Sequence, residues 1–145
     1  MKLLNTLQGL IFVYFCGTLA FGTWVLRGYF EAIPVEFEEA AMVDGCSKLS
    51  ALFRVVLPAA LPGIIAVGLI TFMSCWGEFT MAMTYVTKKD YLTLPAGIYF
   101  FIKQEFADWG ALMAMSTFAC IPSLIVFLFF QKYLEKGITA GALKI

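Results

Sequence analysis

The residue types that carry out most enzyme chemistry are scarce in this chain of 145 residues. Histidine is absent, so the sequence cannot build a His-based triad, a zinc site with His ligands or a histidine pH switch. The motifs G-x-x-x-x-G-K-[ST], H-E-x-x-H and G-x-S-x-G do not occur. Four widely spaced cysteines are interpreted as small apolar packing residues: Cys16, Cys46, Cys75 and Cys120. The sequence therefore predicts no catalytic residue, no metal site and no cofactor.

Charged side chains concentrate in one polar stretch, residues 27–54, which holds eight of them. Pro34 suits a first helical turn, and the glutamates that follow it would lie near the positive end of that helix's dipole. Asp44-Gly45 predicts a turn or a helix C-cap, after which Ser47 or Asp44 could cap a second helix. The pattern therefore predicts a short helical hairpin.

Composition indicates what kind of molecule holds this hairpin. The chain is 61% hydrophobic and 14% charged, with a mean hydropathy of +0.87, whereas a soluble domain is about half apolar and about a quarter charged. The formal net charge is zero, which removes the basic surface expected of a nucleic-acid-binding protein. We therefore expect a small helical membrane protein, or a piece of a larger one, with no nucleic acid as partner.

Long uncharged runs, the second interrupted by Glu78, predict three transmembrane helices, at about residues 3–26, 57–86 and 109–131. A helix the length of the first run covers about 36 Å, enough to cross a hydrocarbon core of about 30 Å. The uncharged run 91–102 is too short to cross and is typical of an interfacial or re-entrant helix. The predicted fold class is an all-α integral membrane protein.

Three polar segments follow from these spans: the hairpin at 31–56, an outer loop at 88–108 and a tail at 132–145. Six basic residues lie on the side of the hairpin and tail, against four on the other side. Because cytoplasmic segments carry the excess of Lys and Arg, hairpin and tail are expected in the cytoplasm. The acidic first helix favours a protein partner, and a helix lying on lipid headgroups is the alternative.

Glu78 is the one acidic residue set amid long apolar runs, and Trp76 lies just before it. An intramembrane carboxylate is a functional candidate by default, so Trp76 and Glu78 are the candidates for lining a translocation path. The alternative is that Glu78 reaches the outer interface and is solvated, while Trp76 anchors the end of a span.

The hairpin carries a specific pattern: Glu39-Ala40-Ala41, three residues, Gly45, nine residues, Val55, one residue and Leu57-Pro58. This resembles the EAA loop of ABC importer permeases, E-A-A-x3-G-x9-I-x-L-P, and departs from it only by Val55 in place of isoleucine. Three further residues match its extended form: Asp44, Phe53 and Pro62.

The resemblance covers nearly the whole chain. Residues 76–79 are similar to the family's W-N-E-F segment, with Gly77 in place of asparagine. Residues 108–110 and 127–133 are similar to its last two spans, and residues 136–144 are similar to its terminal K-G-L-T-A-G-A-V-K-G. Together these segments resemble the second permease subunit of a maltose-type carbohydrate importer.

This resemblance implies a transport subunit that is not an enzyme and imports sugars. ATP would be bound and hydrolysed by a separate ABC ATPase dimer that receives the hairpin in a groove. The other implied partners are a second permease subunit in a heterodimer, an extracytoplasmic sugar-binding protein at the outer loop, and membrane lipid. The implied location is the bacterial or archaeal cytoplasmic membrane, as a multi-pass protein.

Roles for single residues follow from the same resemblance. Glu39 is expected to pair with a basic group of the ATPase, and Gly45 to permit the break between the two helices. The implied ATPase-coupling residues are Glu38, Glu39, Ala40, Ala41, Asp44, Gly45, Phe53, Leu57 and Pro58. The tail residues implied to contact the ATPase are Gly137, Thr139 and Gly141.

Members of this family usually have more spans before the loop, and this chain begins at what looks like the fourth. We therefore expect the C-terminal half of a type I ABC importer permease. Two alternatives stay open: the same mechanism with another cargo such as glycerol phosphate, or a truncated accessory membrane protein with no transport of its own.

Overall fold

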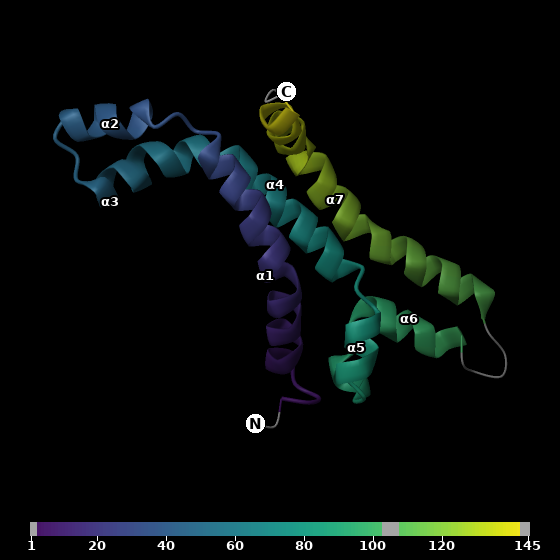
Figure 1. Ribbon diagram of the computed structural model, residues 1–145. Helices are drawn as coiled ribbons and strands as arrows, with labels where there is room; N and C mark the ends of the chain where they lie inside the picture. Colours follow the sequence, from purple (N-terminus) through teal and green to yellow (C-terminus); the bar gives the residue numbers. More distant parts are fainter. Residues whose placement is uncertain (1–2, 103–107, 143–145) are drawn as a thin grey trace. The chain divides into compact units, whose positions relative to one another are not determined.

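The computed structural model describes residues 3–102 and 108–142, and the side chains within them except at 89, 100, 101 and 135–142. Every regular element in these ranges is a helix, which confirms the all-α fold class (Figure 1). The elements in chain order are α1 (Leu7–Glu31), α2 (Glu36–Val43), α3 (Lys48–Ala51), the π-helical turn η1 (Leu52–Val56), α4 (Leu57–Trp76), α5 (Thr80–Tyr85), the 3-10 turn η2 (Lys89–Tyr91), α6 (Leu94–Ile102) and α7 (Trp109–Ala142).

Three helices in the described part of the chain are long and apolar enough to cross a membrane, as the sequence predicted. They comprise Leu7–Glu31, Lys48–Trp76 and Trp109–Leu134, with 25, 29 and 26 residues. Even the shortest covers about 37 Å, which exceeds a hydrocarbon core of about 30 Å. Few of their residues are buried within the chain, as expected of helices that meet lipid or other membrane helices.

The helix Lys48–Trp76 consists of α3, η1 and α4 without a loop between them. Pro58 explains the wide π-helical turn, because a proline ring clashes with the carbonyl four residues earlier in an α-helix. That carbonyl belongs to Arg54, which lies inside η1. The second helix of the hairpin therefore continues directly into a membrane helix.

The chain divides into two compact units, and each is described by itself. Unit 1 comprises the residues up to Leu19 together with Thr71–Leu128, and unit 2 comprises Ala20–Ile70 and the residues from Phe129 onward. The helices α1, α4 and α7 each pass from one unit into the other.

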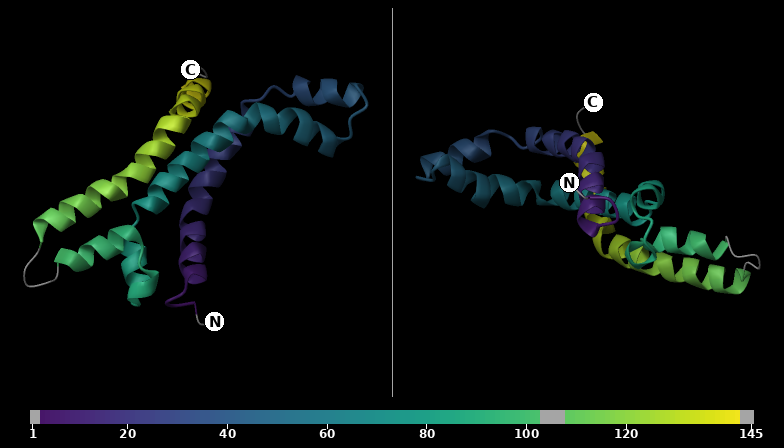
Figure 2. Two further views of the ribbon diagram at one scale, coloured as in Figure 1. Left: turned by 180° about the vertical axis from the view of Figure 1, so that it is seen from behind. Right: turned by 90° about the horizontal axis from the view of Figure 1, so that it is seen from below.

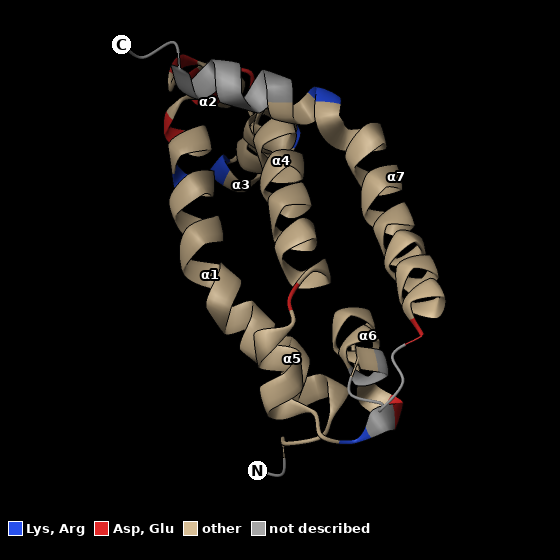
Figure 3. Cartoon of the chain, turned by 90° about the vertical axis from the view of Figure 1, so that its right-hand side faces the viewer, with Lys and Arg blue, Asp and Glu red and all other residues tan. Residues whose placement is uncertain are grey.

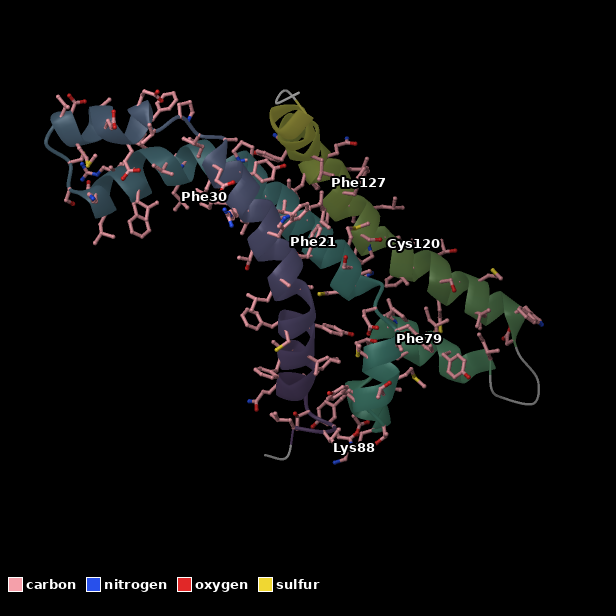
Figure 4. The ribbon with its side chains drawn as sticks, in the orientation of Figure 1. Phe21, Phe30, Phe79, Lys88, Cys120 and Phe127 are labelled. Carbon is pink, nitrogen blue, oxygen red and sulfur yellow. The ribbon has the colours of Figure 1, made fainter. Side chains whose placement is uncertain are left out.

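Unit 1 has a small core formed by the start of α1, by α5 and by the start of α6. Its buried members are Leu10, Ala82, Val86 and Ala96. Phe79, labelled in Figure 4, packs on this cluster, and its ring meets that of Tyr99 edge-on with the centroids 5.3 Å apart. Aromatic pairs favour this arrangement because the positive edge of one ring faces the negative face of the other.

The membrane helix α4 ends at Trp76, whereas the sequence predicted a span running to residue 86. Gly77 weakens the helix at this point. Glu78 then accepts hydrogen bonds from the backbone N–H groups of Met81 and Ala82, at 2.8 and 3.1 Å, and so starts the new helix α5 (Figure 3, where the acidic residue between α4 and α5 is red).

The last helix is longer than predicted. The sequence predicted a third span to residue 131 and a tail at 132–145, and α7 continues as a helix from the span into that tail, to Ala142. Most residues just after 131 are strong helix formers, and the two glycines at 137 and 141 do not end the helix. Residues 143–145 of the predicted tail lie outside the described residues.

Asn5 fastens the chain before α1 to the loop after α5, within unit 1. Its side-chain oxygen accepts hydrogen bonds from the N–H of Thr87 (2.7 Å), the hydroxyl of Thr87 (2.8 Å) and the N–H of Lys88 (3.1 Å). Its own N–H donates to the carbonyl of Tyr85 at 3.1 Å. Asn5 adopts a φ of 61°, a left-handed conformation that asparagine tolerates better than most residues.

Asn5→Ala is expected to lower the free energy of unfolding by about 1–2 kcal/mol, because three donors lose their acceptor at a half-exposed site. Thermal unfolding in detergent measures the loss. Asn5→Asp is the matched control, since it keeps the acceptor oxygen and tolerates the same φ. Equal stability of the alanine variant and the original protein would contradict the role of Asn5.

Candidate functional site

The acidic helix α2 forms the first half of the hairpin. It has eight residues, and its first turn contains Glu36, Glu38 and Glu39, where the helix dipole favours negative charge. Within residues 3–102 and 108–142, these three glutamates have no ion-pair partner; the salt bridge there joins Arg27 to Glu31, at 2.7 Å. The charge of α2 is therefore available to a group outside the described chain.

The hairpin turns at Gly45. The N–H of Cys46 donates to the carbonyl of Ala41 (3.0 Å), and the N–H of Gly45 donates to that of Met42 (3.1 Å). This pair of bonds is a Schellman motif, which requires a left-handed residue just past the helix. Gly45 has a φ of 89°, the positive value expected for the break between the two helices. Asp44 is the C-cap residue of α2.

Of the two predicted caps for the second helix, the structure uses Ser47. Its hydroxyl oxygen accepts a hydrogen bond from the N–H of Ser50 at 3.3 Å. The helix α2 lies beside α3 and η1, as Figure 1 and both views of Figure 2 show. Two small residues, Ala41 and Ala51, are buried in this hairpin, so their size permits the two helices to approach each other.

The two alanines of the E-A-A motif therefore differ. Ala41 is 7% exposed and packs within the hairpin, whereas Ala40 and Glu39 are exposed. Glu38 is half-buried. Both alanines were predicted to be ATPase-coupling residues; that role stays a prediction, and of the two side chains only that of Ala40 is exposed in the described chain.

Large apolar side chains accompany the acidic groups on the outside of the hairpin. Val43 is 87% exposed, Leu49 70% and Phe53 64%. At the junction with α4, Leu57 is half-buried and Pro58 is exposed. Exposed large apolar side chains on an element that projects from a helix bundle are typical of protein interaction sites.

Glu78 and Trp76 lie in unit 1 and make contacts within it. Besides the two N–H groups of α5, the hydroxyl of Tyr14 donates to the Glu78 carboxylate at 3.1 Å. The indole N–H of Trp76 donates to the carbonyl of Ala119 at 3.0 Å. Lining of a translocation path stays a prediction for both residues, and capping of α5 is a role of Glu78 that the sequence did not indicate.

Hydrogen bonds stabilise the ionised form of the Glu78 carboxyl group. Burial alone would raise the pKa of its carboxyl. The hydrogen bonds donated by the backbone N–H groups of α5 and by the Tyr14 hydroxyl act in the other direction and are together stronger. The pKa of Glu78 therefore lies below that of an ordinary glutamate, and the group is ionised at neutral pH.

Some site residues could not be found, or cannot be placed, from the sequence. Tyr14 and Asn5 pair with residues more than sixty positions away, at Glu78 and Thr87, and no local pattern signals such pairings. The predicted ATPase-contacting residues Gly137, Thr139 and Gly141 lie in α7, but their side chains are outside the described residues.

The described chain thus combines three helices long and apolar enough to cross a membrane with an acidic helical hairpin between the first two. Residues 1–140 match the family described as binding-protein-dependent transport system inner membrane component, and the chain belongs to this family. The family predicted from the E-A-A pattern is thereby confirmed.

Relatives among known proteins include transport system permeases, three of which have names that state a cargo. The chain is 39% identical over 142 residues to the trehalose/maltose transport system permease protein MalG of Thermococcus litoralis, covering 97% of this chain and 51% of MalG. It is 37% identical over 143 residues to the diacetylchitobiose uptake system permease protein DasC of Streptomyces coelicolor, covering 99% and 52%. It is 37% identical over 145 residues to the sulfoquinovosyl glycerol transport system permease protein SmoH of Agrobacterium fabrum, covering 99% and 50%. The chain spans about half the length of these relatives.

Proposed function

We propose that this chain is part of a permease subunit that imports sugars, driven by ATP hydrolysis on a separate ABC ATPase dimer. The observation that carries the proposal is the hairpin 31–56, an acidic and apolar surface built on a membrane helix of a transport-family protein. The names of three relatives, the permeases for trehalose/maltose, diacetylchitobiose and sulfoquinovosyl glycerol, support a carbohydrate as cargo.

The hairpin would rest in a groove of the ATPase and follow its movement. The exposed side chains Phe53, Leu49 and Val43 would supply the apolar contact, and Glu39 would pair with a basic group of the ATPase. Because α3, η1 and α4 form one uninterrupted helix, a displacement of the hairpin would be transmitted to α4 as a rigid-body movement.

The remaining partners would complete the transport path. A second permease subunit would cover the apolar helix faces that the chain leaves exposed, together with membrane lipid. An extracytoplasmic sugar-binding protein would contact the outer loop 88–108, and the C-terminal end of α7 would face the ATPase. ATP would be bound by the ATPase alone, and no nucleic acid would take part.

Co-purification tests this proposal. The chain, within the subunit to which it belongs, is expected to be isolated from membranes in complex with an ABC ATPase and a second permease. Sugar-loaded binding proteins are then added in turn, and the matching sugar is expected to stimulate ATP hydrolysis by the complex. Isolation without an ATPase, or with the hairpin accessible to proteases from the outer side of the membrane, would contradict the proposal.

A further inference from the structure

Within unit 2, α1 and α4 meet at two glycines, one on each helix. A methyl group added at Gly22 of α1 would lie 3.7 Å from Cγ1 of Val67, an ordinary van der Waals contact. Gly63 of α4 faces Tyr29 of α1. Residue 22 of α1 pairs with residue 67 of α4, and residue 29 of α1 pairs with residue 63 of α4. Because the numbers rise along one helix and fall along the other, the two helices are antiparallel here.

The contact at Gly63 is much closer than the one at Gly22. A methyl group added at Gly63 would lie 2.8 Å from Cδ2 of the Tyr29 ring and closer still to Cγ and Cδ1. Gly63 is buried and Tyr29 is half-buried. The Tyr29 ring therefore packs directly against the backbone of α4. Only glycine, which has no Cβ, leaves room for the ring at this position. We call this contact the Tyr29–Gly63 joint.

The joint lies at the base of the hairpin. Tyr29 is in the last turn of α1, next to Phe30, which is labelled in Figure 4, and Gly63 is near the beginning of α4. The chain between them contains the whole hairpin, α2, α3 and η1. The joint therefore brings together the two helices from which the hairpin leaves and to which it returns.

The two connections of the hairpin to these helices differ in stiffness. On the α4 side the helix is continuous from Lys48 to Trp76. On the α1 side, residues 32–35 are not helical and separate α1 from α2. A displacement of the hairpin would therefore reach α4 directly, but it would reach α1 through the packing of Tyr29 on α4.

We propose that the Tyr29–Gly63 joint makes α1 and α4 move as a pair when the hairpin is displaced. Tyr29 and Gly63 are positioning residues for coupling, and they act through the hairpin rather than by touching ATPase or sugar. The inference rests on the proposed function, because the displacement it transmits is the one imposed by the ATPase. Interlocked side chains transmit displacement in this way because packed interiors are hardly compressible.

Gly63→Ala tests the joint in the complete transporter, with Gly68→Ala as the matched control. Both substitutions lie on α4 and add one methyl group, but at Gly68 the added group meets no atom of the chain within 4 Å. In assembled complexes, Gly63→Ala is expected to lower the sugar imported per ATP hydrolysed by about fivefold to tenfold, a usual size for coupling between sites. Gly68→Ala is expected to leave this ratio unchanged.

Substitutions at Tyr29 give an independent test of the joint. They test the coupling of α1 to α4 even if Gly63→Ala does not accumulate in the membrane. Tyr29→Ala removes the ring and is expected to lower the same ratio, whereas Tyr29→Phe keeps the ring and is expected to preserve it. A purely structural role would reduce the amount of complex but not the sugar imported per ATP in the complex that remains.

Two results would overturn the inference: a ratio for Gly63→Ala equal to that for Gly68→Ala, or equal ratios for the two Tyr29 variants. Failure of the proposed function has a different signature. In that case the unmodified transporter itself would show no sugar-stimulated ATP hydrolysis, so there would be no coupling for the Tyr29–Gly63 joint to affect.

Discussion

Glu39→Lys is expected to reduce sugar import by about tenfold or more, because losing one member of a desolvated charge pair at an interface costs about 2–5 kcal/mol. Glu39 is exposed in the first turn of α2, and no group of the described chain neutralises it. With lysine in its place, two positive charges would face each other in the ATPase groove. Import of labelled sugar, together with the amount of ATPase that co-purifies, measures the effect.

Glu36→Lys provides the control for this prediction. Glu36 is also exposed and lies in the same first turn, so its reversal costs the same interaction with the helix dipole, about 0.3–1 kcal/mol. It lies outside the E-A-A pattern, and most of the import is expected to survive. If both variants import sugar equally well, the charge at position 39 has no specific partner and its proposed role is wrong.

Glu78→Ala is expected to lower the free energy of unfolding by about 2–3 kcal/mol, because hydrogen bonds to a charged group contribute more than neutral ones. The substitution removes the acceptor for two N–H groups at the start of α5 and for the Tyr14 hydroxyl. Unfolding of the purified protein in detergent gives the free energy. Hydrogen exchange at the Met81 and Ala82 amides shows whether the start of α5 has opened.

The smaller substitution Tyr14→Phe separates the two functions of the carboxylate. It removes the link to α1 and leaves the cap of α5 intact, so the loss is expected to be about 1 kcal/mol without faster exchange at Met81 and Ala82. Unchanged exchange in Glu78→Ala would mean that the carboxylate does not cap α5 in solution.

The same carboxylate predicts an acid-sensitive cap. Because the pKa of Glu78 is lower in the folded protein than in the unfolded chain, the unfolded chain takes up the proton first as the pH falls. The stabilisation is therefore complete above the ordinary pKa of glutamate and is lost as the pH falls through the lower, folded value. Stability measured against pH should lose this acid-dependent part in Glu78→Gln, and an unchanged profile would contradict the assignment.

Patterns within short windows predicted much of this fold. Uncharged runs are long enough to identify the membrane helices, because a bilayer tolerates few charges over twenty residues. Asp44-Gly45 identified the turn of the hairpin, since few residues other than glycine adopt a φ of 89° without strain. The spacing of the E-A-A pattern identified the family, which a composition alone could not do.

Contacts between distant segments were not predictable in the same way. Apolar residues lie on both sides of Gly77 and Glu78, so the end of α4 depends on hydrogen bonds that only the folded chain reveals. The burial of Ala41 and the exposure of Ala40 depend on which side of α2 meets α3. Tyr29 and Gly63 lie on either side of the hairpin in the sequence, and nothing in either residue type predicts that the two are in contact.

The π-helical turn η1 also fixes the direction in which the hairpin points around the axis of α4. An α-helix rotates by about 100° per residue, and a π-helical turn accommodates one residue more than an α-helical turn. If Leu52–Val56 formed an ordinary α-helical turn with the same number of residues, α2 would be rotated by about 100° about that axis. Loops exchanged between permeases must therefore agree in this π-helical turn as well as in length, because otherwise the acidic side of α2 would point in another direction.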